Sequence, residues 1–239
     1  MYDTSVFERK LASLGIEITD VQCQQFIKYY EMLVETNKVM NLTAITDFDE
    51  VIDKHFVDSL YLAKIKNLDQ ELSLIDVGTG AGFPGIPLKI MFPKVKVTLL
   101  DSLNKRINFL NNVIEALGLE DIKACHGRAE DFGHNPEYRE KYDVCVSRAV
   151  ANMSTLSEYC MPFVKVDGDF IPYKSGSVQE ELDQAKKAVK ILGGKLVDII
   201  SYQLPETDIE RSMVVIHKTA QTKKAYPRKA GKPSREPLK

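Results

Sequence analysis

The sequence predicts an α/β fold built on a seven-stranded, mostly parallel sheet, and two observations carry this prediction. From residue 72 onward, short β-rich runs alternate with stretches of helical periodicity, which is typical of a parallel sheet covered on both faces. The last two runs have no helix between them. The turn-rich stretch 205–208 joins them, so the seventh strand should run antiparallel to the sixth.

An N-terminal helical subdomain is expected over residues 1–70. Thr19 and Gln22 form a capping-box pattern, and an apolar stripe at helical spacing follows it. Asp47 with Glu50 marks a second helix start, and an earlier short helix should end at Gly15.

The predicted sheet and its helices follow over residues 71–218. Helices are expected over 105–117 and 178–192. Seven strands that end in a hairpin are the layout of the class I methyltransferase fold, a Rossmann-like fold. The expected strands are 72–77, 95–100, 122–126, 142–147, 169–173, 195–204 and 211–217.

The composition is that of an ordinary folded protein, with 239 residues, 44% of them hydrophobic, and a net charge of −2. No secretory signal and no apolar run of roughly 18 residues is visible. The four cysteines are far apart without a C-x-x-C pair, so buried reduced thiols are expected rather than a metal site. We therefore expect a cytoplasmic monomer that binds no membrane and no metal.

The charge is distributed unevenly along the chain. The segment from Lys218 to the C-terminus carries seven net positive charges, so the residues before it carry nine net negative ones. A basic tail over residues 219–239 favours a polyanionic partner, although a solvated end without a function is equally compatible with the charge alone.

The strongest local signal is the glycine loop that follows the first strand, Asp76-Val77-Gly78-Thr79-Gly80-Ala81-Gly82-Phe83-Pro84-Gly85. In an open α/β sheet, ligands bind at the carboxyl ends of the strands, where this loop lies. Gly80-x-Gly82-x-x-Gly85 also satisfies the dinucleotide pattern. However, the Asp76 carboxylate would repel a pyrophosphate and attract the cations of S-adenosylmethionine. The loop therefore favours S-adenosylmethionine, and a dinucleotide or a purely structural turn remains as an alternative.

Other candidate cofactor residues follow neighbouring strands. Asp101 could accept both ribose hydroxyls or cap the next helix, and Ala129-Glu130 could frame the adenine or simply begin a helix. Phe83 could pack against the cofactor or belong to the core. Arg148 could bind the methionine carboxylate or an RNA phosphate, or form an internal salt bridge.

The end of the fourth strand bears on the chemistry. It reads Ser-Arg-Ala-Val, without the Asp/Asn-Pro-Pro-aromatic turn of amino-directed enzymes, and neither Cys145 nor Cys160 is placed as a nucleophile. This favours a target atom that is already nucleophilic, such as guanine N7, with no catalytic residue needed beyond orientation. His55 lies near a helical apolar stripe and is expected to be structural.

At these residues the chain resembles the bacterial RsmG proteins, also called the GidB family. The resemblance spans nearly the whole chain and combines the glycine loop with residues 40–45 (Met-Asn-Leu-Thr-Ala-Ile), 54–60 (Lys-His-Phe-Val-Asp-Ser-Leu) and 147–150. It also includes the tail Tyr226-Pro227-Arg228-Lys229-Ala230-Gly231-Lys232-Pro233. Lys174-Ser175 departs from the expected Lys-Gly.

The resemblance implies methylation of guanine N7 in 16S ribosomal RNA of the small subunit, with S-adenosylmethionine as cofactor. Two other functions remain open, an NAD(P)-dependent oxidoreductase and a non-catalytic RNA-binding or ribosome-assembly protein on the same scaffold. The cofactor positions implied are Gly78, Phe83, Ala129, Glu130 and Arg148, to which our own reading adds Asp76, Gly80 and Asp101. RNA contacts are expected from Lys174, Arg228, Lys229, Lys232 and Arg235.

Overall fold

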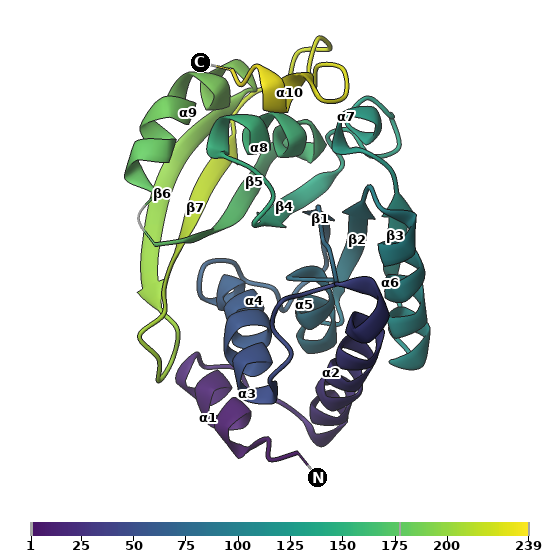
Figure 1. Cartoon of the computed structure of the whole chain (residues 1–239). Helices are drawn as coiled ribbons and strands as arrows, with labels where there is room; N and C mark the ends of the chain where they lie inside the picture. The colour runs from purple at the N-terminus through teal and green to yellow at the C-terminus, as the bar shows by residue number, and fades with distance from the viewer. Residues whose placement is uncertain (1, 177, 239) are drawn as a thin grey trace.

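The computed structural model, which describes residues 2–176 and 178–238, contains one seven-stranded sheet between two layers of helices (Figure 1). The strand order is β3-β2-β1-β4-β5-β7-β6, and only β7 runs antiparallel to its neighbours. The expected class I methyltransferase fold and its antiparallel last strand are confirmed. The bounds are β1 Leu72–Val77, β2 Val95–Asp101, β3 Ile122–His126, β4 Tyr142–Arg148, β5 Val164–Ser175, β6 Gly194–Gln203 and β7 Glu210–Lys218.

The helices divide between the two faces of the sheet. Alternate strand residues point to opposite faces, so Leu74 joins one apolar cluster and Ile75 the other. The first cluster includes residues of the N-terminal helices and also of α5 (Gly85–Met91) and α6 (Asn104–Ala116). The second includes residues of α8 (Met153–Cys160) and α9 (Gln179–Ile191). The N-terminal helices thus share their core with the sheet.

The N-terminal helices are α1 (Ser5–Ser13), α2 (Asp20–Met40), α3 (Phe48–Val51) and α4 (Asp58–Leu60), and they gather at one end of the molecule (Figure 1). The predicted capping box is present, because the Thr19 side chain accepts from the Gln22 amide and Gln22 accepts from the Thr19 amide. Asp47 caps α3, since its side chain accepts from the amide of Glu50.

The sequence pattern did not predict a π-helical segment, Ile52–Val57, between α3 and α4. π turns often accompany functional sites because they displace side chains and carbonyls from the regular helical positions. Here the segment carries Lys54 and His55, and both belong to the site described below.

The C-terminal segment is not a free tail. Residues after β7 fold back over α7 (Ala129–Phe132) and α8 and include the short helix α10 (Lys232–Arg235). Figure 1 shows α10 and the C-terminus at the end of the molecule opposite to α1.

Candidate cofactor and RNA site

The glycine loop after β1 is held against β2. The amides of Gly78 and Thr79 both donate to the Leu100 carbonyl, at 2.8 and 3.2 Å. Gly78 and Gly80 adopt positive φ angles of 73° and 63°, a region that L side chains rarely enter. A Cβ on Gly78 would also lie 2.6 Å from the Val150 side chain, so the loop after β4 closes directly on the glycine loop.

Asp76 lies behind this loop and does not line the cavity. Its Oδ2 accepts from the Thr79 hydroxyl at 2.7 Å and from the Gly85 amide at 2.9 Å, while its buried Oδ1 has no partner within residues 2–176 and 178–238. Burial raises the pKa of Asp76 to about 6. The expected contact between Asp76 and a ligand is therefore revised, because the carboxylate shapes the loop from within the core.

Asp101 is held by hydrogen bonds within the chain, and its contact with a ribose stays a prediction. Its carboxylate accepts from the Gly80 amide and, through its other oxygen, from the Leu103 amide just before α6, both at 2.9 Å. Arg106 donates to it at 3.2 Å. Asp101, the last residue of β2, nevertheless lines the cavity beside the glycine loop that is described below.

A cavity of about 790 Å³ opens beside the glycine loop. Three parts of the chain form it, and the first is the loop itself with Phe83, Asp101 and Arg106. The second comes from the N-terminal segment and contributes Leu42, Thr43, Ile45, Lys54, His55 and Asp58. The third comes from the ends of β4 and β5, the loop after β4, the first turn of α9 and the start of β7. It contributes Arg148, Ala149, Val150, Tyr173, Lys174, Ser175, Glu181 and Arg211.

Phe83, His55 and Arg148 come from the three different parts and pack against one another. The His55 ring stacks on Phe83 with centroids 4.5 Å apart, and the Arg148 guanidinium lies 5.2 Å from the centroid of the same ring. The His55 nitrogens lie 2.9 Å from the Thr43 hydroxyl and 3.2 Å from an Arg148 nitrogen. Burial, followed by the charge of Arg148, lowers the pKa of His55 to about 3, so the ring is neutral near pH 7.

A buried carboxylate, Asp58, connects two arginines of the cavity. One oxygen of Asp58 pairs with Arg148 at 2.8 Å, and the other pairs with Arg211 at 3.4 Å. Arg148 also donates to the Lys54 carbonyl of the π-helical segment at 3.0 Å. The internal salt bridge considered for Arg148 therefore exists, and the same side chain still faces the cavity.

Ala129 and Glu130 do not line this cavity. Glu130 is buried, and its carboxylate accepts from the Gly231 amide of the C-terminal segment at 2.9 Å. This bond involves only one oxygen of the Glu130 carboxylate, so contact of Ala129 and Glu130 with the adenine stays a prediction.

The C-terminal segment is anchored through Arg228. The Arg228 guanidinium and the Arg228 backbone amide both donate to the carboxylate of Glu158, which is fully buried in α8. Further contacts join Thr155 to the Pro233 carbonyl and Arg139 to the carbonyls of Thr222 and Tyr226. Arg228 was expected to bind RNA phosphate, and this expectation is revised because its charge is neutralised inside the protein.

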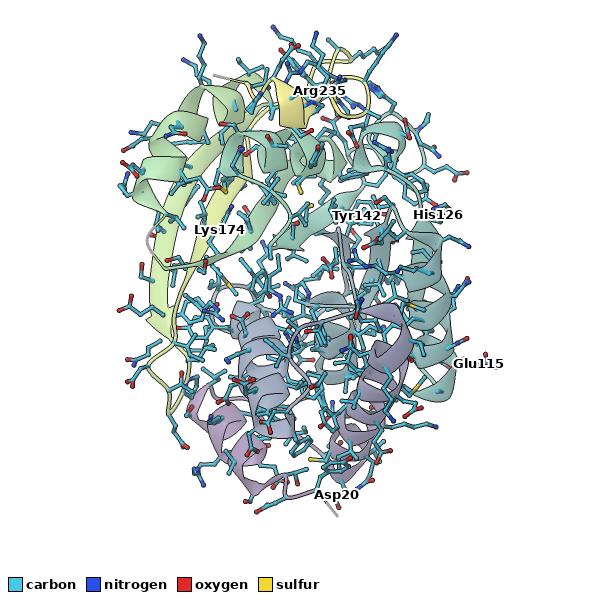
Figure 2. All side chains as sticks on the ribbon, viewed as in Figure 1. Asp20, Glu115, His126, Tyr142, Lys174 and Arg235 are labelled. Atoms are coloured by element: carbon cyan, nitrogen blue, oxygen red, sulfur yellow. The ribbon has the colours of Figure 1, made fainter. Side chains whose placement is uncertain are left out.

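The remaining basic residues of the segment differ among themselves. Lys218 is buried and donates to the Met161 carbonyl and to Thr222, and burial lowers its pKa to about 8. Lys229, Lys232 and Arg235 are exposed, and their contact with RNA stays a prediction. Figure 2 shows Arg235 beside α10, away from Lys174 near the end of β5.

The cysteines are free thiols, with Cys23, Cys145 and Cys160 buried and Cys125 partly exposed. Burial raises the pKa of Cys145 well above its usual value, so this thiol is not a nucleophile. Within residues 2–176 and 178–238, no three His, Cys, Asp or Glu side chains are arranged to hold a metal ion. No helix in the same ranges is long and apolar enough to cross a membrane.

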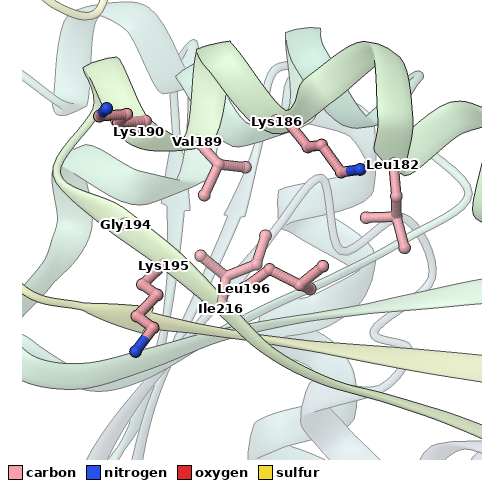
Figure 3. A pocket seen from close by; sticks show the side chains of 8 residues that line it. All are labelled: Leu182, Lys186, Val189, Lys190, Gly194, Lys195, Leu196 and Ile216. Carbon is pink, nitrogen blue, oxygen red and sulfur yellow. The ribbon is translucent and has the colours of Figure 1, made fainter.

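A second, mainly apolar cavity of about 370 Å³ lies between α9 and strands β6 and β7 (Figure 3). Leu182 and Val189 of α9 face it from one side and Ile216 of β7 from the other, and three lysines, Lys186, Lys190 and Lys195, also line it. None of the glycine-loop residues contributes to this cavity, so it is not the cofactor site.

Sequence reasoning assigned no site role to His55, Thr43, Asp58, Arg211 or Glu181, although all five line the cavity. For His55 and Asp58 there was a signal. Polar side chains interrupt the apolar stripe at residues 54–58, and a polar residue on a helix face that packs against a core needs a partner. For Thr43, Arg211 and Glu181 the local pattern carried no such signal.

Comparison with known proteins agrees with this geometry. A family model described as rRNA small subunit methyltransferase G matches residues 22–211. A protein named ribosomal RNA small subunit methyltransferase G from Lachnoclostridium phytofermentans is 53% identical over 238 residues, covering 100% of this chain and 98% of its own. The protein of that name from Staphylococcus saprophyticus is 53% identical over 230 residues, covering 96% of each chain.

Solved structures support the fold alone. A SAM dependent methyltransferase from Aquifex aeolicus superposes with a TM-score of 0.53 at 16% identity, over 71% of this chain and 93% of its own. TYW2 of M. jannaschii, in complex with AdoMet, reaches 0.55 at 12% identity, over 73% and 79%. With the match to the family model and relatives at 53% identity over nearly their whole length, the chain belongs to the GidB family of rRNA small subunit methyltransferase G proteins.

Proposed function

We propose that this protein transfers a methyl group from S-adenosylmethionine to N7 of a guanine in 16S ribosomal RNA of the small subunit. The observation that carries the proposal is that a single cavity joins the glycine loop and the Asp101 carboxylate to the cations Lys54, Arg148 and Arg211. One side of the cavity suits a nucleoside cofactor, and the other suits an anionic polymer.

The cofactor side fits S-adenosylmethionine in size and in chemistry. A cavity of about 790 Å³ lies within the range of roughly 300–1,000 Å³ that small-molecule sites occupy. Asp101 is placed to accept from ribose hydroxyls, Phe83 offers an apolar face, and Arg148 offers a cation for the carboxylate. The buried Asp76 carboxylate adds negative charge behind the loop, which favours a cationic ligand over a pyrophosphate.

Bound S-adenosylmethionine supplies an electrophilic methyl group, so the protein has to orient the acceptor. Guanine N7 carries a free lone pair and needs no general base, and holding it in line with the methyl group is catalysis by proximity. The site fits this requirement. With its pKa lowered to about 3, His55 is a weak base, and its nitrogens already contact Thr43 and Arg148.

The RNA is expected to approach over the cations at the cavity mouth and over the exposed Lys229, Lys232 and Arg235. We propose that the partner is the small ribosomal subunit or its precursor, and that the protein acts on it in the cytoplasm as a monomer, without a metal or a membrane. We also propose that residues 1–70, 71–218 and 219–239 form three functional units, a helical subdomain, a cofactor-binding domain and a basic C-terminal segment.

The test is incubation of the protein with labelled S-adenosylmethionine and small subunits, followed by mapping of the modified nucleotide. One labelled guanine, sensitive to cleavage chemistry specific for 7-methylguanine, is the expected result. Label at another atom would contradict the proposal. A melting temperature that rises with NAD(H) but not with S-adenosylmethionine would favour an oxidoreductase. Absence of transfer despite RNA binding would favour an assembly protein.

A further inference from the structure

An ion pair inside the cavity has no role in the mechanism above. Lys174 of β5 lies 2.7 Å from the Oε1 atom of Glu181 in α9. The same lysine donates to the Ala151 carbonyl at 3.0 Å, and the same oxygen accepts from the Met153 amide at 2.5 Å. The pair is therefore fixed to the loop that follows β4.

That loop also contacts the cofactor side of the cavity. Val150 closes on Gly78, since a Cβ added there would meet its side chain at 2.6 Å. Val150 is nevertheless 41% exposed, and it lines the cavity. A nucleic-acid base that packs on Val150 would therefore lie in the same cavity as the glycine loop and the Lys174–Glu181 pair.

The pair presents one cation and one uncommitted carboxylate oxygen. Lys174 is 13% exposed and Glu181 is 30% exposed, so both are accessible from the cavity only in part. Glu181 Oε2 makes no hydrogen bond with the chain as described, from residue 2 to 176 and 178 to 238. An ammonium can only donate a hydrogen bond, and an ionised carboxylate can only accept one.

One donor beside one acceptor fits guanine when the donor faces position 6 and the acceptor faces N1, and it fits adenine only when the two are exchanged. Guanine carries the O6 acceptor next to the N1–H donor, while adenine carries an amino donor next to the N1 acceptor. The two bases share N7, so N7 alone cannot distinguish them. A methyltransferase that acts on N7 therefore needs a second contact for selectivity, at O6 and N1.

Resting on the function proposed above, we infer that Lys174 and Glu181 select guanine. Lys174 Nζ donates to O6, and Glu181 Oε2 accepts from N1–H. Lys174 was expected to contact RNA, and this inference assigns that contact to the base. Neither side chain contacts the 2-amino group of guanine, so recognition of the base depends on O6 and N1–H.

The experiment uses the full-length protein and small subunits assembled from ligated 16S RNA that carries guanosine, inosine, 2-aminopurine or adenosine at the methylated position. All four bases keep N7. For the wild type, inosine should be methylated with a kcat/KM within about tenfold of guanosine, because it retains O6 and N1–H. The other two should fall by about 10- to 100-fold or more, the usual size of a bidentate base contact.

The decisive variant is Glu181→Gln. Its amide oxygen still accepts from Met153 and Lys174, so the loop stays fixed, while its Nε2 now meets the N1–H donor of guanine. We expect kcat/KM on guanosine to fall about 10- to 100-fold. The melting temperature and the affinity for S-adenosylmethionine should stay unchanged. The exposed Glu180→Gln on the same helix is the matched control and should behave as wild type.

The alternative is that the pair only fixes the loop. In that case Glu181→Ala is impaired while Glu181→Gln equals the wild type, and this result would overturn the inference. Equal methylation of guanosine and 2-aminopurine by the wild type would overturn it as well, without any variant. A wild type that methylates no guanine contradicts the proposed function rather than the selectivity of this pair.

Discussion

Asp58 and Arg148 form an ion pair of 2.8 Å that joins the N-terminal helices to the end of β4. Asp58 is 2% exposed and also holds Arg211, so one buried carboxylate balances two partly buried guanidinium groups. Because β4, β7 and α4 all meet at this carboxylate, the N-terminal helices are part of the site and not only a cover for the sheet.

Replacing Asp58 with alanine should therefore destabilise the protein. Removing one partner of a buried pair leaves an uncompensated charge, which costs about 3–5 kcal/mol of unfolding free energy. Denaturant unfolding measures this loss. Glu50→Ala is the control, since Glu50 pairs with Lys54 at an exposed position and its removal should cost less than about 1 kcal/mol. Equal effects of the two variants would contradict this account of Asp58.

Replacing Asp101 with alanine should weaken the binding of S-adenosylmethionine. The ribose would lose a charge-assisted hydrogen bond, worth roughly 1.5–3 kcal/mol, or about 10- to 150-fold in affinity. Calorimetry measures the affinity directly. Asp131→Ala, an exposed residue of α7 outside the cavity, serves as the control. Unchanged affinity in Asp101→Ala would remove this carboxylate from the cofactor site.

Arg228→Ala should act on stability. Glu158 would be left fully buried without its partner, and the expected loss is about 3–5 kcal/mol. A thermal or denaturant melt tests this, with the exposed neighbour Lys229→Ala as the control. If Arg228→Ala melts like the wild type, the C-terminal segment is not anchored through this pair.

The triple replacement of Lys229, Lys232 and Arg235 with alanine should act on RNA binding instead. Each phosphate contact on a single strand contributes about 0.7 to the log–log salt slope, so three contacts should lower the slope by about 2. Binding of 16S RNA across a salt series measures it, with S-adenosylmethionine affinity as the internal control. An unchanged slope would mean that the RNA-binding surface lies at Lys54, Arg148 and Arg211 alone.

Asp76→Asn should change how stability depends on pH. Burial raises the pKa of Asp76 to about 6 in the folded protein, so the folded state binds the proton more tightly than the unfolded state. Its stabilising contribution is thus full below about pH 4 and is lost as the pH rises through 6. The unfolding free energy of Asp76→Asn relative to wild type should rise by about 1–2 kcal/mol between pH 5 and pH 8. A constant difference across this range would contradict the raised pKa.

The sheet, its antiparallel last strand and the place of the glycine loop could all be predicted from the amino-acid sequence. These features rest on short-range patterns. Strand–helix alternation, the capping box at Thr19 and Gln22, and the glycines after Asp76 each restrict the backbone within a few residues. The carboxyl ends of parallel strands then meet at one edge, which is why Asp101 and Arg148 could be placed near the loop before the structure was known.

Which charges are neutralised and which face the cavity depends on contacts between distant parts of the chain, and the sequence did not predict it. In the sequence, Arg228 and Lys229 are adjacent basic residues of one tail, yet one is paired with the buried Glu158 and the other is exposed. Likewise, Glu181 belongs to an ordinary amphipathic helix until β5 brings Lys174 beside it. A charge count contains no information about partners that are distant in the chain, because the free energy of a charged group depends on its burial and on the opposite charge within a few ångströms.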